Sequence, residues 1–166
     1  MQLTSHSMRA CRDIRTLLVW VHSHVTGWME VSPPSLEVGI ADYRVCRARL
    51  HVIALDARSV GLLAYASLCV RLGEQLEPLF RANHLPRSAM RLLWQWSKCS
   101  LGYLDLVSDD DHSIELVALL DLAPLRGHYS EQERAMLASG LIDDRIRLTT
   151  GEKSEVTPRS NGWSPQ

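Results

Sequence analysis

The 166-residue sequence has no hydrophobic run long enough to span a membrane, no excess of charge of either sign and few aromatic residues. Its net charge is −1, so no large positive field attracts nucleic acid or an anionic membrane. The apolar run from Leu17 to Val21 is too short for the core of a signal peptide, and no small-residue cleavage site follows it. We therefore expect a cytoplasmic protein of about one domain, without nucleic-acid binding or membrane insertion.

Metal-binding and disulfide patterns are also absent. The four cysteines are far apart, with no C-x-x-C pair and no histidine at ligand spacing: Cys11, Cys46, Cys69 and Cys99. A disulfide framework is one interpretation, and reduced core thiols are the interpretation we favour. His22 and His24 lie two residues apart, about 200° around a helix, which prevents them from sharing a metal ion. The sequence therefore predicts no metal site and no cofactor.

Motifs for catalysis are missing as well. The chain has no glycine-rich phosphate loop, no G-x-S-x-G nucleophile turn and no H-E-x-x-H zinc motif. The acidic residues are scattered, so no carboxylate pair is in place for acid–base chemistry. The run "DDDH" at 109–112 resembles a ligand cluster, but we favour a solvated helix cap. We expect no enzyme.

What the sequence does contain is helical apolar spacing almost throughout, without the alternation of strands. This predicts an all-α fold, an antiparallel bundle over residues 1–147, followed by a disordered polar tail at 148–166. The second helix has the most regular stripe, with spacings of 3 and 4 that are typical of a buried seam. That stripe is Val38, Ala41, Val45, Ala48, Val52 and Leu55. A second apolar set covers a neighbouring face of the same helix: Leu36, Ile40, Tyr43 and Leu50.

The other helices have one predicted core face each. In the first it is Ile14, Leu17, Leu18, Val21, Val25 and Trp28. In the third it is Tyr65, Cys69, Leu72, Leu76 and Leu79, after a break at Gly61. Pro86 opens the fourth, with Ala89, Leu93, Trp96, Ser100, Tyr103 and Val107 inward. The fifth directs Ile114, Val117, Leu120 and Leu122 inward and ends by Pro124 and Gly127. A capping box at 130–133 starts a sixth helix over 131–139, which Gly140 closes.

The stretch "HVIALDARSVGLLAYASLCVRLGEQLE" carries a resemblance to a known family. It resembles the histidine-phosphotransfer (HPt) domain, a small helical bundle with an H-x-x-K-G motif on one helix and an L-x-x-x-L-E end on the next. More closely, it resembles the N-terminal domain of the CheA-like hybrid kinase of type IV pilus chemosensory systems, and it is also similar to the second domain of the pilus scaffold protein FimL. Tyr65 fits the tyrosine of that family's "LYG". The later run "LVALLDLAPLRG" takes the place of the family's "LxLLPxLNxLRAARG". The HPt-like core covers about residues 36–127.

Aligning on Tyr65 places the family's phosphate-accepting histidine at Ile53, its lysine at Asp56 and its glycine at Ala57. The resemblance therefore implies a bundle that has lost the phosphate acceptor, since isoleucine has no nucleophile and Asp56 repels a phosphoryl group. His51 lies two residues before that position. We expect it to face away from the surface on which an HPt domain meets its receiver.

A basic stripe runs along the same helix: Arg44, Arg47, His51 and Arg58. One interpretation is a solvated face with pairs within the helix, to Glu37 or Asp42, and this is the one we favour. The other is a docking strip for an acidic partner.

The resemblance implies a non-catalytic scaffold or regulatory protein of a type IV pilus (twitching motility) chemosensory pathway. It would bind a histidine kinase, a receiver domain or a polar hub protein. Two alternatives stay open: active phosphotransfer through His51, and a helical bundle that binds a small molecule in a pocket lined by tryptophan. Trp94 and Trp96 point in different directions, so we expect one in the core and one at the surface or in a groove.

Overall fold

The computed structural model describes residues 5–30, 36–106 and 112–150, with no side-chain description for 36–41. All regular structure in these residues is helical, which confirms the all-α prediction. The elements are α1 (Ser5–Glu30), α2 (Leu36–Ser59), α3 (Leu63–Arg81), α4 (Arg87–Tyr103), α5 (Ser113–Ala118), the 3-10 turn η1 (Leu119–Asp121) and α6 (Glu131–Thr150).

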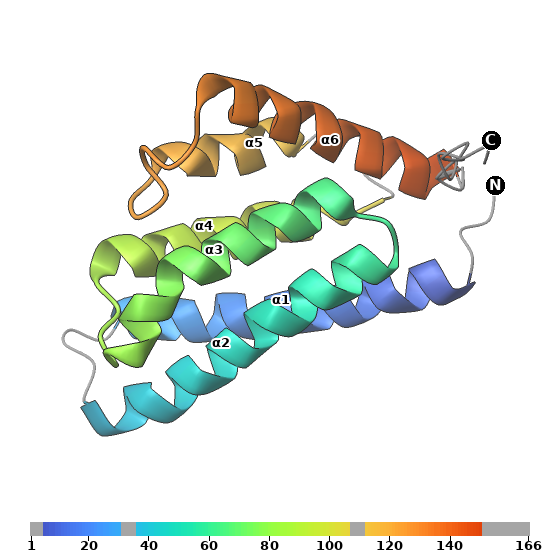
Figure 1. Ribbon diagram of the computed structural model, residues 1–166. Helices are drawn as coiled ribbons and strands as arrows, with labels where there is room; N and C mark the ends of the chain where they lie inside the picture. Colours follow the sequence, from blue (N-terminus) through green and yellow to red (C-terminus); the bar gives the residue numbers. More distant parts are fainter. Residues whose placement is uncertain (1–4, 31–35, 107–111, 151–166) are drawn as a thin grey trace, which may run out of the picture.

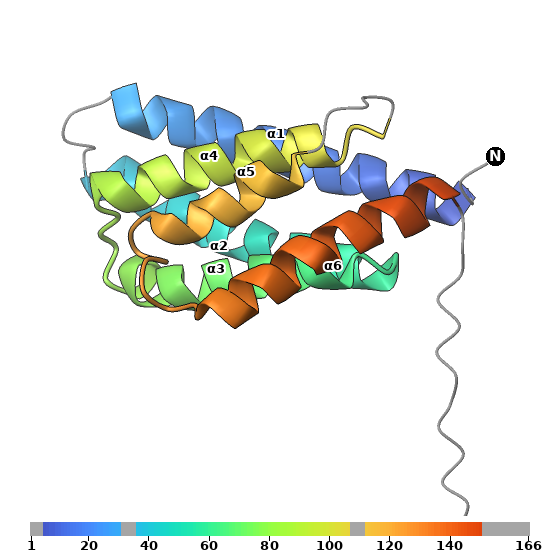
Figure 2. The ribbon, with the colours of Figure 1, turned by 90° about the horizontal axis from the view of Figure 1, so that it is seen from above.

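The first four helices form the predicted antiparallel bundle, and α5 and α6 lie on one side of it (Figure 1). Each helix runs opposite to the one before it. α2 packs against α3 and α1, while α1 also packs against α4. α6 crosses obliquely over α3, and α5 lies beside α4 (Figure 2). The start of α1 and the end of α6 are at the same end of the molecule.

The predicted interruptions between helices occur at Gly61 and Pro86. Gly61 has φ +86°, a conformation that glycine adopts at little cost, and it separates α2 from α3. The N–H of Leu62 then donates to the carbonyl of Ala57 at 2.9 Å, which closes the last turn of α2. Pro86 precedes α4 in an extended conformation, as predicted.

For α1, α3 and α4 the predicted core faces are confirmed. The buried residues of α1 include Ile14, Leu18, Val21, Val25 and Trp28, and Leu17 is half-buried. In α3 they include Tyr65, Cys69, Leu72 and Leu76, with Leu79 half-buried. In α4 they include Ala89, Leu93, Trp96, Ser100 and Tyr103. Val107 lies outside the described residues.

For α2 the predicted regular stripe is wrong where it can be checked, whereas Tyr43 and Leu50 of the second predicted set are buried. Val45, Val52 and Leu55 are 40%, 41% and 52% exposed, so the regular stripe faces solvent. The core face instead consists of Tyr43, Cys46, Leu50, Ile53, Ala54 and Ala57. α2 is apolar on two faces, and its neighbours α1 and α3 cover only one of them.

The prediction for the fifth helix is also partly wrong. Ile114 is 74% exposed, whereas Leu116 and Leu119 are buried along with Leu120. α5 has six residues and then tightens into η1, which moves the inward positions relative to one uninterrupted α-helix.

α6 does not end at Gly140 but continues to Thr150. A Cβ at Gly140 would lie 2.8 Å from the Cβ of Ala64, so this glycine allows α6 to approach α3 closely. Leu148 is buried, hence the proposed boundary between 147 and 148 falls inside a helix. The rest of the predicted tail, residues 151–166, lies outside the described part. The capping box is confirmed: the Ser130 N–H donates to Glu133 Oε2 at 2.7 Å, and the Glu133 N–H donates to Ser130 Oγ at 3.2 Å.

Candidate functional site: the groove between α2 and α3

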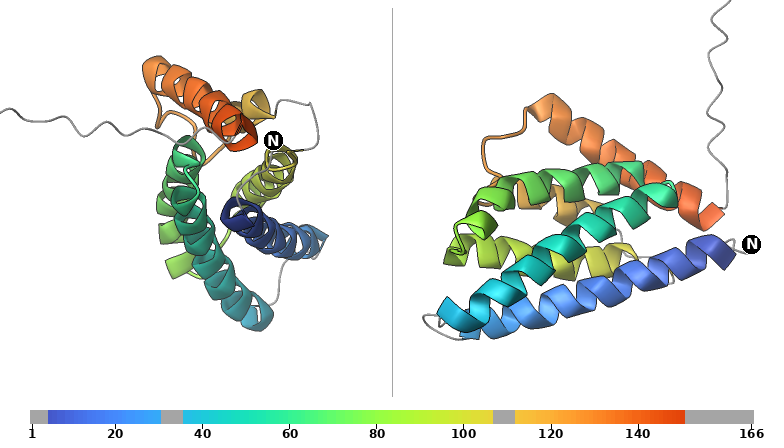
Figure 3. Two further views of the ribbon diagram at one scale, coloured as in Figure 1. Left: turned by 90° about the vertical axis from the view of Figure 1, so that its right-hand side faces the viewer. Right: turned by 60° about the horizontal axis from the view of Figure 1, so that its bottom comes forward.

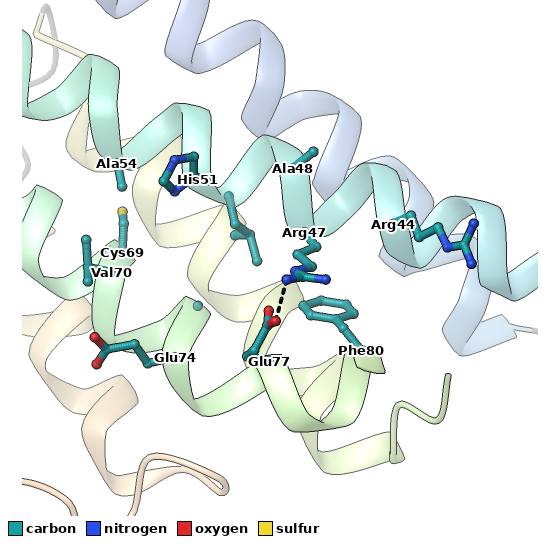
Figure 4. Close-up of a pocket in the computed structure, with 12 residues that line it drawn as sticks. Arg44, Arg47, Ala48, His51, Ala54, Cys69, Val70, Glu74, Glu77 and Phe80 are labelled. Atoms are coloured by element: carbon teal, nitrogen blue, oxygen red, sulfur yellow. Dashed lines mark ion pairs between the residues drawn. The ribbon is translucent and has the colours of Figure 1, made fainter. Parts of the chain in front are cut away.

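A groove of about 620 Å³ runs between α2 and α3 (Figure 4). Its inner wall is mainly apolar and includes Leu50, Ala54, Cys69, Val70 and Phe80. Its rim carries charge of both signs: Arg44, Arg47 and His51 on α2, and Glu74 and Glu77 on α3. The groove therefore combines an apolar base with a rim that is basic on one side and acidic on the other.

One ion pair crosses the rim. Arg47 pairs with Glu77, and Arg81 donates to the same carboxylate at 2.8 Å. The partner of Arg47 is thus on α3, so the predicted pairing within α2 is wrong for this residue. Both side chains are partly in water, and such a pair contributes at most about 1 kcal/mol to stability.

The four residues of the predicted basic stripe lie in different surroundings. Arg44, Arg47 and His51 line the groove, but Arg58 does not, although it is exposed on the same helix. In the described part of the chain Arg44 and Arg58 form no ion pair, while Glu37 has no described side chain. Both arginine side chains are exposed.

The three positions that the HPt resemblance assigns to phosphate transfer do not form a surface site. Ile53 and Ala57 are fully buried in the core, and Asp56 is half-buried. His51, by contrast, is exposed at the rim of the groove, where Figure 4 places it across from Glu74 and Val70. On α2 the solvent-facing imidazole of His51 and the side chain of Ile53 are thus on different sides of the helix.

The cysteines are free thiols, as favoured by the sequence. Burial raises the pKa of Cys69 to about 12 and that of Cys46 to about 12. Burial also raises the pKa of Cys11 and Cys99. Because the thiolate is the reactive form, none of these thiols is set up as a nucleophile.

One of the two neighbouring tryptophans is in the core and the other lines a groove, as expected. Trp96 is buried, whereas Trp94 lines a second groove of about 490 Å³ together with Lys98, His112 and Glu115. His22 Nδ1 lies 2.9 Å from Ser97 Oγ on α4, and His24 Nδ1 lies 2.9 Å from the Trp20 carbonyl. No group of three metal-ligating side chains occurs among the described residues, and Asp109–Asp111 lie outside them.

One important residue could not be found from the sequence. Asp144 is buried on α6, and its Oδ2 accepts hydrogen bonds from the N–H groups of Ala64 at 2.7 Å and Tyr65 at 3.2 Å. Arg147 donates to its other oxygen at 2.6 Å. Asp144 thus caps the first turn of α3, whose own preceding residue, Leu62, has no capping side chain. Burial raises the pKa of Asp144, and the two N–H donors and Arg147 oppose that rise.

No helix in the described residues combines the length and the apolar character needed to cross a membrane. No protein-family model, curated protein or solved structure matches the chain. The functional assignment therefore rests on the residues and on the HPt resemblance.

Proposed function

We propose that the protein is a non-catalytic scaffold or regulatory protein that binds partner proteins through the outer surface of α2. The observation that carries the proposal is the division of α2 into two sides. The resemblance assigns the phosphate acceptor to Ile53, whose side chain is inside the core. The opposite side presents exposed Val45, Val52 and Leu55 beside Arg44 and Arg58, which form no ion pair among the described residues. Such a surface is suited to binding a protein rather than to transferring phosphate.

The pathway in the proposal comes from the HPt resemblance. The relatives that the sequence resembles belong to type IV pilus chemosensory systems. The expected partners are accordingly a histidine kinase, a receiver domain or a polar hub protein of such a system.

The test is affinity capture of the tagged full chain from its own host, with mild cross-linking and mass spectrometry. Recovery of pilus chemosensory kinases, receivers or hub proteins is the expected result. A matched sample with Arg44→Glu and Arg58→Glu should lose them, whereas Arg91→Glu, an exposed change on α4, should retain them. Recovery of no component of that system by the wild type contradicts the proposal.

A second candidate, phosphotransfer through His51, is favoured by one observation. The imidazole of His51 is exposed, and Arg47 lies one turn earlier on the same helix. In that reaction the P–O bond of a receiver's aspartyl phosphate breaks and a P–N bond to the imidazole forms. The carboxylate of the receiver is released, and the proton of the imidazole passes to water. Glu74 and Glu77 line the same groove and would repel the phosphoryl group.

The two candidates separate in a transfer assay with a radiolabelled phosphorylated receiver domain. The scaffold proposal expects no label on the wild-type chain. Label that persists in alkali, disappears in His51→Ala and is retained in His84→Ala would instead establish the carrier. His84 is a suitable control because it is exposed and belongs to the connection after α3, outside the groove.

A further inference from the structure

The fold leaves one regular apolar stripe of α2 exposed to solvent. The "α2 seam" consists of Val45, Ala48, Val52 and Leu55, spaced 3, 4 and 3 residues apart. All four are exposed, and the three large ones are 40%, 41% and 52% exposed. With 100° per residue the seam is centred opposite the buried face around Cys46, Leu50 and Ile53. α2 lies at the front of the right-hand view of Figure 3, with no helix over it.

Spacings of 3 and 4 are those with which one helix packs against another. Positions i, i+3, i+7 and i+10 form the a and d positions of a heptad, where apolar side chains interdigitate with a facing helix. α1 and α3 already occupy the other side of α2. The seam is therefore a second helix-packing surface, and it lacks a partner among the described residues.

The charges on either side of the seam indicate which helix fits. On the groove side, Arg44, His51 and Arg58 follow at seven-residue intervals, the g positions of the heptad. On the other side, Asp42, Arg49 and Asp56 follow at the same interval, the e positions. Arg49 is held over the Trp20 ring, 4.2 Å from its centroid. The groove side is thus an uninterrupted row of basic residues next to the apolar seam.

A second copy of the chain fits this surface poorly. In an antiparallel pair of α2 helices, Arg44 would face Arg58 of the other copy, and the two His51 side chains would face each other. In a parallel pair, Arg44 would face Arg49 of the other copy, and only His51 would face an acid, Asp56. Like charges beside the seam disfavour both arrangements.

We infer that the α2 seam docks an amphipathic helix of a partner protein whose apolar stripe is flanked by carboxylates on the side that meets Arg44, His51 and Arg58. The apolar stripe supplies buried area, and the carboxylates set the orientation and exclude basic helices. The inference rests on the proposed binding function and names the chemistry of its partner. Ala48 belongs both to the seam and to the wall of the groove, so a docked helix lies along the groove's basic rim.

The test uses stapled, fluorescein-labelled helical peptides of three heptads with leucine at a and d. One peptide has glutamate along one flank and glutamine along the other, and its matched control has lysine in place of glutamate. A second pair has the charges on the other flank, so that both directions of the bound helix are sampled. Anisotropy with the full-length protein gives the affinities. We expect at least tenfold tighter binding of a glutamate peptide than of its lysine match.

Three variants locate the binding. Val52→Glu should weaken the glutamate peptide at least tenfold and leave the thermal midpoint unchanged, since this side chain is exposed. Arg44→Glu with Arg58→Glu should reverse the preference in favour of the lysine peptide. Met136→Glu, which alters a side chain 67% exposed on α6, is the matched control and should bind as the wild type does.

Four outcomes overturn the inference: no peptide binds, the two charge types bind equally, Val52→Glu binds normally, or sedimentation shows a wild-type dimer that Val52→Glu dissociates. The affinity-capture experiment distinguishes a failure of the docking inference from a failure of the proposed function. If the wild type and Val52→Glu recover the same pilus proteins, the function stands and the docking surface is elsewhere. If the wild type recovers no pilus proteins, the proposed function is wrong. The peptide affinities alone then show whether the α2 seam docks a helix.

Discussion

α2 and α3 form one hairpin, yet their outer sides differ. α3 is covered by α6, which approaches it closely at Gly140 and caps its first turn through Asp144. No described helix covers the outer side of α2, although that side has the more regular apolar stripe. A regular apolar stripe with heptad spacing therefore need not face the core of its own chain.

The largest expected effect is a difference in stability between substitutions on the buried face and on the exposed face of α2. Ile53→Ala removes a fully buried side chain and should lower the free energy of unfolding by about 3 kcal/mol. Val52→Ala, on the exposed seam, should change it by less than about 0.5 kcal/mol. Urea unfolding followed by circular dichroism measures both. An equal loss in the two variants would mean that the seam is buried in solution.

The packing of α6 over α3 should depend on the hydrogen bonds that Asp144 accepts from the first turn of α3. Asp144→Ala leaves the N–H groups of Ala64 and Tyr65 without their acceptor, which should cost about 2 kcal/mol. Asp144→Asn retains an acceptor oxygen and should lose less. The same urea titration ranks the two, and amide exchange at the first turn of α3 should quicken in the alanine variant. Unchanged stability in Asp144→Ala would show that the cap supplied by Asp144 does not stabilise the fold.

The close approach of α6 to α3 gives a smaller effect with a built-in control. Gly140→Ala gains about 1 kcal/mol of helix propensity but forces its Cβ against that of Ala64, and overpacking costs about 1–3 kcal/mol. We expect a net loss of about 1 kcal/mol, which the double variant Gly140→Ala with Ala64→Gly recovers. If the single variant is more stable than the wild type, the helices have room to separate.

The smallest effect is in the pH dependence of the cap. Because burial raises the pKa of Asp144, the folded chain binds its proton more tightly than the unfolded chain does. The stability that this group contributes is therefore complete below its ordinary pKa and is lost as the pH rises through the raised value. The stability difference between wild type and Asp144→Asn should accordingly shrink from acid toward neutral pH. A difference that grows over that range would contradict the raised pKa.

How far the sequence predicts the fold depends on how many apolar faces a helix has. α1 has one such stripe, so periodicity identified its core residues, as it did for α3 and α4. α2 has two, and only the positions of α1 and α3 decide between them. The local signals of α6 likewise predicted only part of the helix. The capping box at Ser130 fixed its start, but Gly140 could not be recognised as a contact glycine without Ala64 opposite it.

The candidate site was predicted in part. The sequence identified the basic stripe of α2, and three of its four residues line the groove. The acidic rim of α3 and the pairing of Arg47 with Glu77 were missed, since they depend on how α2 and α3 face each other. Asp144 lies 80 residues from Ala64, and no local pattern marks it as a cap for another helix.

That separation has a consequence for the order in which the protein is made. A ribosome releases α3 long before it releases α6, so the hairpin of α2 and α3 emerges with the first turn of α3 still lacking its acceptor. The contact that completes an early element is supplied by one of the last residues of the described chain. In nascent chains that end before Asp144, the N–H groups of Ala64 and Tyr65 therefore lack this acceptor until the last helix is synthesised.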